Sequence, residues 1–117
     1  MTVTNTQNKA TELCEYLKKN HEGRENAASS KTLEAAFDID GRAVRRCINA
    51  LRQKWFPICS DTVGYYYAAS QQEINETISR LNSLITKISN AKTGLLTAHY
   101  KTPSHIPISI EIKLSIG

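Results

Sequence analysis

Residues 40–57 decide the fold of this chain, and they read DGRAVRRCINALRQKWFP. Apolar side chains recur within them at steps of three and four residues, which is the spacing of one face of an α-helix. These apolar residues are Val44, Cys47, Ile48, Leu51 and Trp55. Asp40 is suited to cap the start of this helix, and Pro57 ends it because proline has no backbone N–H to donate. The pattern predicts a helix whose inner face includes Trp55.

The opposite face of the same helix is basic. Residues 41–56 contain five Lys or Arg side chains and no Asp or Glu, whereas ordinary protein surfaces mix the two signs. The net charge of the whole chain is only +4, so the positive charge is concentrated in this helix. A concentrated basic helix favours contact with DNA over a surface that is only solvated.

Two further helices are predicted before the basic helix. Residues 7–20 carry an apolar stripe at helical spacing. The stripe consists of Ala10, Leu13, Cys14 and Leu17. After a polar loop, Ser30 is suited to cap a second, short helix, because its hydroxyl can accept a hydrogen bond from a free backbone N–H. A tight break over residues 38–40 then turns Ile39 inward.

A β-hairpin is predicted after the basic helix. Residues 58–60 and 65–68 are strand-like, and residues 61–64 between them have the chemistry of a turn. Alternation places Tyr65 and Tyr67 on one face of the second strand and Tyr66 on the other. We expect the first two to pack inward and Tyr66 to be available to phosphate.

The order of these elements predicts an α+β fold, a winged helix-turn-helix with three helices and a β-hairpin wing over residues 1–69. The residues also resemble the winged-helix domains of bacterial repressors, in particular biotin-repressor and DeoR-like regulators. The similarity covers roughly residues 7–69 and lies in KTLEAAFDIDGRAVRRCINALR at 31–52, PICS at 57–60 and GYYY at 64–67. This chain has Asp38 where the family often has Gly, and Glu34 where the family has a small residue.

The resemblance implies that the basic helix enters the major groove of DNA and that the wing touches the sugar-phosphate backbone. By position, it places Arg42, Arg45, Arg46 and Asn49 toward the DNA. Because arginine can pair with both major-groove acceptors of guanine, we expect Arg42 with Arg45 or Arg46 to read bases. The residues expected to hold phosphate are Ser30, Lys31, Thr32, Arg52, Lys54, Thr62 and Tyr66.

A further helical pattern occupies residues 70–98. Ser70 and Glu73 form a capping box at its start, and Gly94 is suited to end it. An apolar seam then follows at heptad spacing. It is made of Ile74, Ile78, Leu81, Ile85 and Ile88. The seam either packs back on the winged helix or joins two copies of the chain. We expect a homodimer, since the hairpin already completes the small core.

Residues 99–117 form a tail in which isoleucine or leucine alternates with other residues from position 106 to 116. A period of two predicts a β-strand with one apolar face. Such a strand needs a partner strand. The candidates are its own copy, the wing of a neighbouring chain, or another protein that it joins by β-augmentation.

Several other classes of function are disfavoured. Cys14, Cys47 and Cys59 lack Cys-x-x-Cys spacing and the three histidines are scattered, so we expect neither disulfides nor a metal site. No catalytic triad, carboxylate pair or phosphate-binding glycine loop is present, so we expect no enzymatic activity and no cofactor. No stretch approaches the roughly 20 apolar residues that span a bilayer, and the N-terminus lacks a secretory signal. We therefore expect a cytoplasmic protein without membrane contact.

These patterns predict sequence-specific binding of double-stranded DNA, with a role in transcriptional regulation in a bacterium or phage. Two alternatives remain open at this point. The chain is either a protein-protein interaction module that docks within a larger assembly, or a DNA-binding accessory factor of replication or recombination. The operator sequence and any effector ligand cannot be predicted from these residues.

Overall fold

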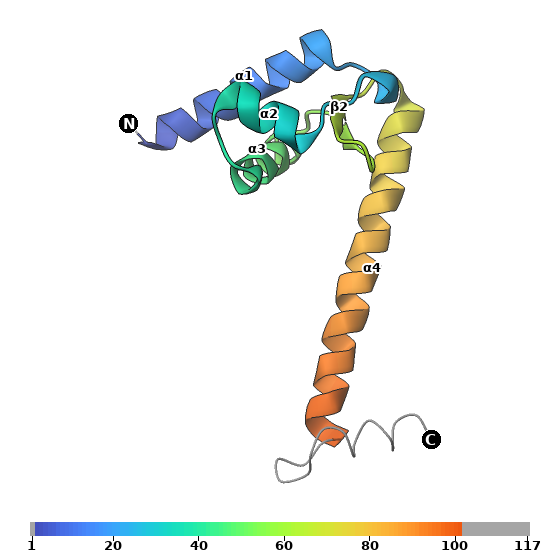
Figure 1. Ribbon diagram of the computed structural model, residues 1–117. Coiled ribbons are helices and arrows are strands. Elements are labelled where there is room, and N and C mark those ends of the chain that lie inside the picture. Colours follow the sequence, from blue (N-terminus) through green and yellow to red (C-terminus); the bar gives the residue numbers. More distant parts are fainter. Residues whose placement is uncertain (1, 102–117) are drawn as a thin grey trace. The chain divides into compact units, whose positions relative to one another are not determined.

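The computed structural model describes residues 2–101, with side chains described for residues 9–98. This part of the chain has an α+β fold with four α-helices, a short 3-10 helix and a two-stranded antiparallel hairpin. The elements are α1 (Thr2–Asn20), η1 (Arg24–Asn26), α2 (Ser30–Phe37), α3 (Gly41–Gln53), β1 (Ile58–Ser60), β2 (Tyr65–Tyr67) and α4 (Gln71–Lys101) (Figure 1). The chain divides into two compact units, with the first ending at Arg80 and the second beginning at Leu81.

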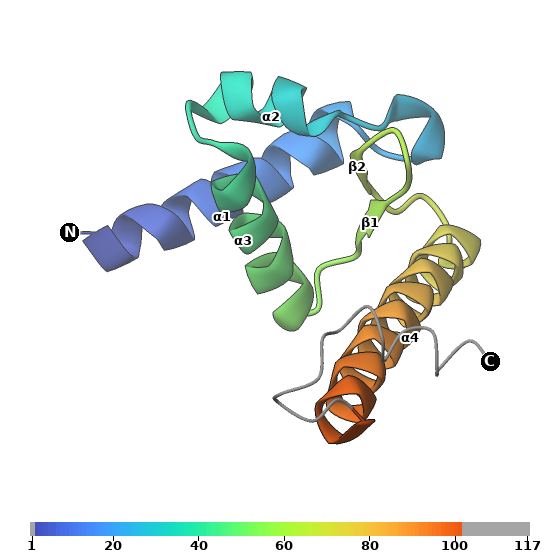
Figure 2. The same ribbon diagram turned by 60° about the horizontal axis from the view of Figure 1, so that its bottom comes forward.

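The core of the first unit lies where α1 meets α2, α3 and β2. Helix α3 crosses α1 in both ribbon views (Figure 1, Figure 2). The buried side chains of this core are Ala10, Leu13, Cys14, Leu17, Ala28, Leu33, Val44, Cys47, Ile48, Leu51 and Ile58. The apolar stripes predicted for the first and third helices therefore form the core, apart from Trp55. The arrangement is compatible with a winged helix.

The turn between α2 and α3 depends on a residue in the left-handed backbone region. Asp38 has φ 52° and ψ 52°, and the next N–H, that of Ile39, donates to the carbonyl of Glu34 at 3.2 Å. Aspartate tolerates this conformation better than most non-glycine residues, so Asp38 can form the turn without glycine. The cap of α2 is Ser29, one residue before the predicted Ser30, and its hydroxyl accepts from the Thr32 N–H.

Helix α3 begins as predicted and ends two residues earlier than its apolar pattern suggests. The Asp40 carboxylate accepts a hydrogen bond from the Ala43 N–H at 2.8 Å. At the other end, Trp55 adopts φ 74°, its N–H donates to the Arg52 carbonyl, and the Phe56 N–H donates to the Leu51 carbonyl. This is the Schellman arrangement that terminates helices. After this turn Trp55 no longer follows the helical period of α3. The prediction that Trp55 belongs to the core is therefore wrong, because 93% of Trp55 is exposed.

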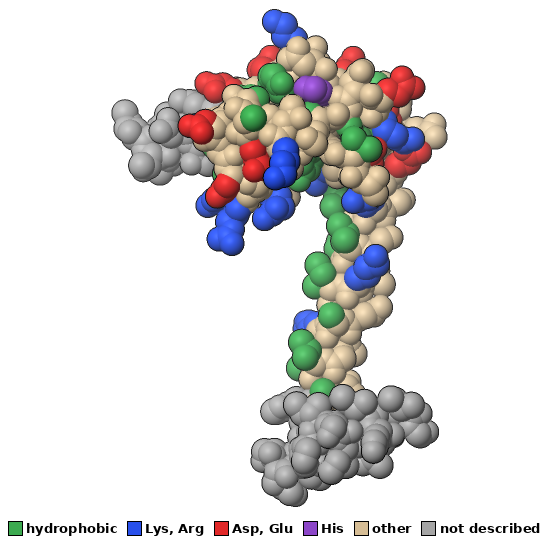
Figure 3. Space-filling view, in the orientation of Figure 1, with side chains coloured by type: hydrophobic (Ala, Val, Ile, Leu, Met, Phe, Trp, Pro, Cys, Tyr) green, Lys and Arg blue, Asp and Glu red, His purple; other side chains and the backbone are tan. Residues whose placement is uncertain are grey.

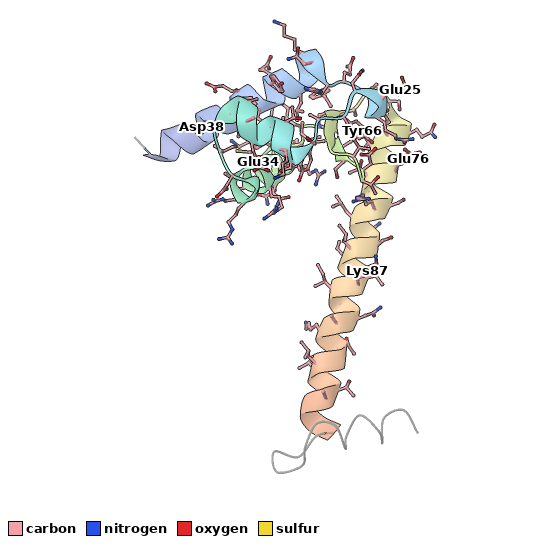
Figure 4. All side chains as sticks on the ribbon, viewed as in Figure 1. Glu25, Glu34, Asp38, Tyr66, Glu76 and Lys87 are labelled. Atoms are coloured by element: carbon pink, nitrogen blue, oxygen red, sulfur yellow. The ribbon has the colours of Figure 1, made fainter. Side chains whose placement is uncertain are left out.

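The hairpin has the predicted strands and is buried on both faces. Cys59 pairs with Tyr66 in the register, so these two side chains share a face. Tyr65 and Tyr67 pack against the main core as predicted. The prediction that Tyr66 is available to phosphate is wrong, because only 1% of it is exposed. The start of α4 lies at this second face, where the Thr77 hydroxyl accepts from the Ser60 N–H (Figure 4).

The loop between α1 and α2 is joined to β2 on the side away from β1. Ala28 and Tyr65 exchange two backbone hydrogen bonds, with N···O distances of 2.7 and 2.8 Å. The Tyr67 N–H donates to the His21 carbonyl, and the Gly23 N–H donates to the Tyr67 carbonyl. Strand β2 is therefore hydrogen-bonded along both edges, which fixes the hairpin to the helical core.

Helix α4 is longer than predicted. Its cap is the Ser70 hydroxyl, which accepts from the Glu73 N–H. The Glu73 carboxylate accepts from the backbone N–H groups of Arg24 and Ala69, and these hydrogen bonds lower its pKa. The helix continues through Gly94 to Lys101, so the prediction that Gly94 ends it is wrong. The predicted strand over residues 106–116 lies outside the described residues.

Candidate nucleic-acid interface

The outer face of α3 forms a continuous polar stripe. Arg42, Arg45, Arg46 and Asn49 are all exposed, as predicted. Gln53 continues the stripe, four residues after Asn49, and is also exposed, although it was not among the residues predicted to contact DNA. Successive residues of an α-helix are about 100° apart around the helix axis, so these five side chains fall within an arc of about 100° around α3. One side of a single helix therefore presents three guanidinium groups and two amides.

The arginines of the stripe form no ion pair with the carboxylates that the structure describes. Among the described side chains, the salt bridge found joins Arg24 and Glu76, and no carboxylate lies within ion-pair distance of Arg42, Arg45 or Arg46. Lys and Arg side chains gather over α3 in the space-filling view (Figure 3). Guanidinium groups that are exposed and unpaired are available to carboxylate, phosphate or base-edge acceptors.

Glu34 lies beneath the stripe and has an internal partner. Its carboxylate accepts from the Ser30 hydroxyl at 2.9 Å (Figure 4). A Cβ added at Gly41 would lie 3.3 Å from the Glu34 carboxylate, so the glycine leaves space for it. Gly41 thus leaves room for the Glu34 carboxylate at the start of α3.

Arg52 was expected to hold phosphate, but its guanidinium is committed within the fold. Its Nε donates to the Ile58 carbonyl at 2.8 Å, and its Nη2 donates to the Ser60 hydroxyl at 3.1 Å. Burial lowers the pKa of Arg52 below its usual value. Arg52 therefore ties the end of α3 to β1 and positions the hairpin.

Of the remaining residues predicted to contact DNA, four are exposed and two are not available for such a contact. Lys31 and Thr32 are exposed in the first turn of α2, and Lys54 is exposed at the end of α3. Thr62 is exposed in the turn of the hairpin. The Ser30 hydroxyl is occupied by Glu34, and Tyr66 is buried, so neither belongs to the interface. The candidate interface, called the α3 surface below, consists of Arg42, Arg45, Arg46, Asn49 and Gln53, with Lys31, Thr32, Lys54 and Thr62 at its edges.

The cysteine thiols lie in the same part of the chain and are buried. Burial raises the pKa of the thiols of Cys14, Cys47 and Cys59. These thiols are thus poor nucleophiles at neutral pH. Within the described residues, no group of three or more His, Cys, Asp or Glu side chains is placed to hold a metal ion. None of the helices described is long and apolar enough to cross a membrane.

Comparisons of the chain with protein-family models, with curated proteins and with solved structures found no match. The fold is α+β and compatible with a winged helix, and the α3 surface is the feature of the chain that indicates a function.

Proposed function

We propose that this chain binds double-stranded DNA as a winged helix-turn-helix protein, with α3 in the major groove and the hairpin at the backbone. The observation that carries this proposal is the exposed stripe of Arg42, Arg45, Arg46 and Asn49 on one face of α3. An α-helix fits the major groove, and the N-terminal half of a recognition helix reaches the base edges. The three arginines lie in that half of α3. Sequence-specific binding of this kind suits a transcriptional regulator.

The proposal is tested by titrating labelled duplexes of random sequence with the protein at two salt concentrations. Release of counterions from DNA makes affinity fall steeply with salt, by about 10³–10⁵ between 50 and 200 mM for about 6–10 phosphate contacts. We expect a decrease in this range, and selection of bound duplexes should then converge on one sequence. Absence of binding at the lower salt concentration would contradict the proposal and favour a protein-interaction module.

We infer further that α4 joins two copies of the chain. Helix α4 has 31 residues, and its apolar seam runs from Ile74 to Ile88, about two heptads, with Leu95 one heptad further on and Lys92 between them. Its apolar side chains form a row along one side of the helix (Figure 3). The members that stand exposed are Ile78, Leu84, Ile85, Ile88, Leu95 and Leu96. Ile78 and Ile85 occupy one heptad position of this seam, and Ile74, Leu81, Ile88 and Leu95 occupy the other.

A second copy also suits the expected DNA site. A symmetric dimer presents two recognition helices to half-sites about one DNA turn apart, so the selected sequence should be palindromic. Ile74 and Leu81 are half-buried, whereas Ile85 and Ile88 are 63% and 69% exposed. Ile74 and Leu81 are thus partly covered, and we infer that Ile85 and Ile88 are left for the partner.

Ile85→Asp is expected to convert the dimer to a monomer, because it places a charge in the centre of the apolar seam. The measurement is molar mass by sedimentation equilibrium for the wild type and the variant at equal concentrations. Asn90→Asp is the matched control, since it adds the same charge on the opposite side of the helix and should leave the mass unchanged. A wild type that stays monomeric would contradict the dimer and leave the seam for a different protein.

A further inference from the structure

Trp55 is exposed at a cost to the fold. It is the single tryptophan of the chain, 93% of it is exposed, and its backbone has φ 74°. The left-handed region is unfavourable for a bulky residue, and glycine is the usual residue at this place in a Schellman motif. Neither burial nor backbone preference explains tryptophan here. A residue that is both strained and exposed points to a contact with a ligand.

The surroundings of Trp55 favour an anionic partner. Trp55 follows Gln53, the last residue of α3, by two positions, so their Cα atoms are at most about 7.6 Å apart. Lys54 lies between them and is exposed, and residues 41–60 contain no Asp or Glu. A protein partner that covered the indole and the exposed Phe56 beside it would also have to cover the Lys54 ammonium, and the cores of protein interfaces are poor in charge. Nucleic acid supplies both negative charge and aromatic rings.

We propose that Trp55 stacks on an unpaired base next to the duplex held by α3. This inference rests on the proposed function and names the DNA that the protein prefers. In the interior of a duplex each base is covered by its neighbours, whereas an unpaired strand leaves base faces free for an indole. Trp55 lies beyond the C-terminal end of α3, whereas the N-terminal half of that helix reaches the paired bases. The protein then binds junctions between double-stranded and single-stranded DNA.

The test compares a blunt duplex, the same duplex with a single-stranded extension at either end, and the single strand alone. Stacking on one base is expected to strengthen binding to one extended duplex over the blunt duplex by about 5- to 150-fold. Trp55→Ala should remove this preference and leave the affinity for the blunt duplex unchanged. Since Trp55 is the single tryptophan, its fluorescence should be quenched by that extended duplex and not by the blunt one.

Trp55→Gly separates this role from a structural one. Glycine adopts φ 74° without strain, so the melting temperature of this variant should be equal to or above that of the wild type, while the preference for the extended duplex is lost. A lower melting temperature would mark Trp55 as structural and overturn the proposal.

The outcomes also separate this proposal from the proposed function. Binding to the blunt duplex without a preference for the extended one, and without quenching, overturns the stacking role and leaves duplex binding intact. An emission that shifts to the blue as protein concentration rises, without DNA, assigns Trp55 to a protein contact and also overturns it. If no DNA binds at low salt, both proposals fail.

Discussion

Replacement of Arg42, Arg45 and Arg46 together by alanine is expected to weaken binding to a selected duplex by at least about a hundredfold. A guanidinium that pairs with guanine contributes about 1–3 kcal/mol, and three are removed. The slope of log affinity against log salt should also become shallower, because any phosphate contacts among them are lost. Fluorescence anisotropy of a labelled duplex measures both quantities.

The same triple variant is expected to fold normally. The three arginines are exposed and none forms an ion pair with a described carboxylate, so the free energy of unfolding should stay within about 0.5 kcal/mol of the wild type. Alanine is also a better helix former than any other residue. Denaturant unfolding followed by circular dichroism provides the check. A variant that loses stability along with binding would show that these arginines hold the fold together.

A control with the same change in net charge tests whether position matters. Lys19, Arg80 and Lys87 are exposed cations on α1 and α4, and their replacement by alanine also removes three positive charges. We expect this variant to bind within about tenfold of the wild type, since distant charges act only through the screened long-range field. Equal losses in both triple variants would mean that overall charge, and not the α3 surface, determines binding.

The sequence predicted the parts of the fold that depend on local periodicity and on capping chemistry. The apolar period of α3 placed Val44, Ile48 and Leu51 in the core, and the Asp40 cap was identified because its carboxylate can reach an N–H three residues ahead. The break predicted over residues 38–40 is present, and Asp38 has φ 52° there. Each of these features is set by residues close together in the chain.

The errors concern residues whose surroundings are set by other segments or by a change in helical period. Alternation assigned Tyr66 to the outer face of the hairpin, but it did not indicate that the start of α4 covers that face. Arg52 has the spacing of a surface cation, yet its partners belong to the next strand. Trp55 followed the apolar period of α3 until the left-handed turn ended the helix. A periodic pattern cannot identify the residue at which the period stops.

Gly64→Ala is expected to lower the free energy of unfolding by about 2–6 kcal/mol. The φ of Gly64 is not positive, so backbone strain is not the reason. A Cβ at this position would lie 2.1 Å from the carbonyl oxygen of Ala28 and 2.9 Å from the Cα of Ser29. Both obstacles are backbone atoms, which cannot rotate away as a flexible side chain can.

Relief of that clash requires the loop and β2 to separate. Ala28 and Tyr65 would then lose their two backbone hydrogen bonds, each worth about 0.5–1.5 kcal/mol, in addition to about 1–3 kcal/mol for the overpacking that remains. The hairpin would come away from the helical core on one edge, and the buried Tyr66 would lose part of its cover. Denaturant unfolding of the variant and the wild type measures the total loss.

Gly94→Ala is the matched control, because the same methyl group is added where no atom lies within 4 Å. Gly94 is inside α4, where alanine is favoured over glycine by about 1 kcal/mol, so this variant should show equal or greater helix content on heating. The two substitutions thus add the same methyl group, but we expect them to change stability in opposite directions. If Gly64→Ala were as stable as the wild type, the backbone pairing of Ala28 with Tyr65 would not be maintained in solution, and the hairpin would be free to move relative to α3.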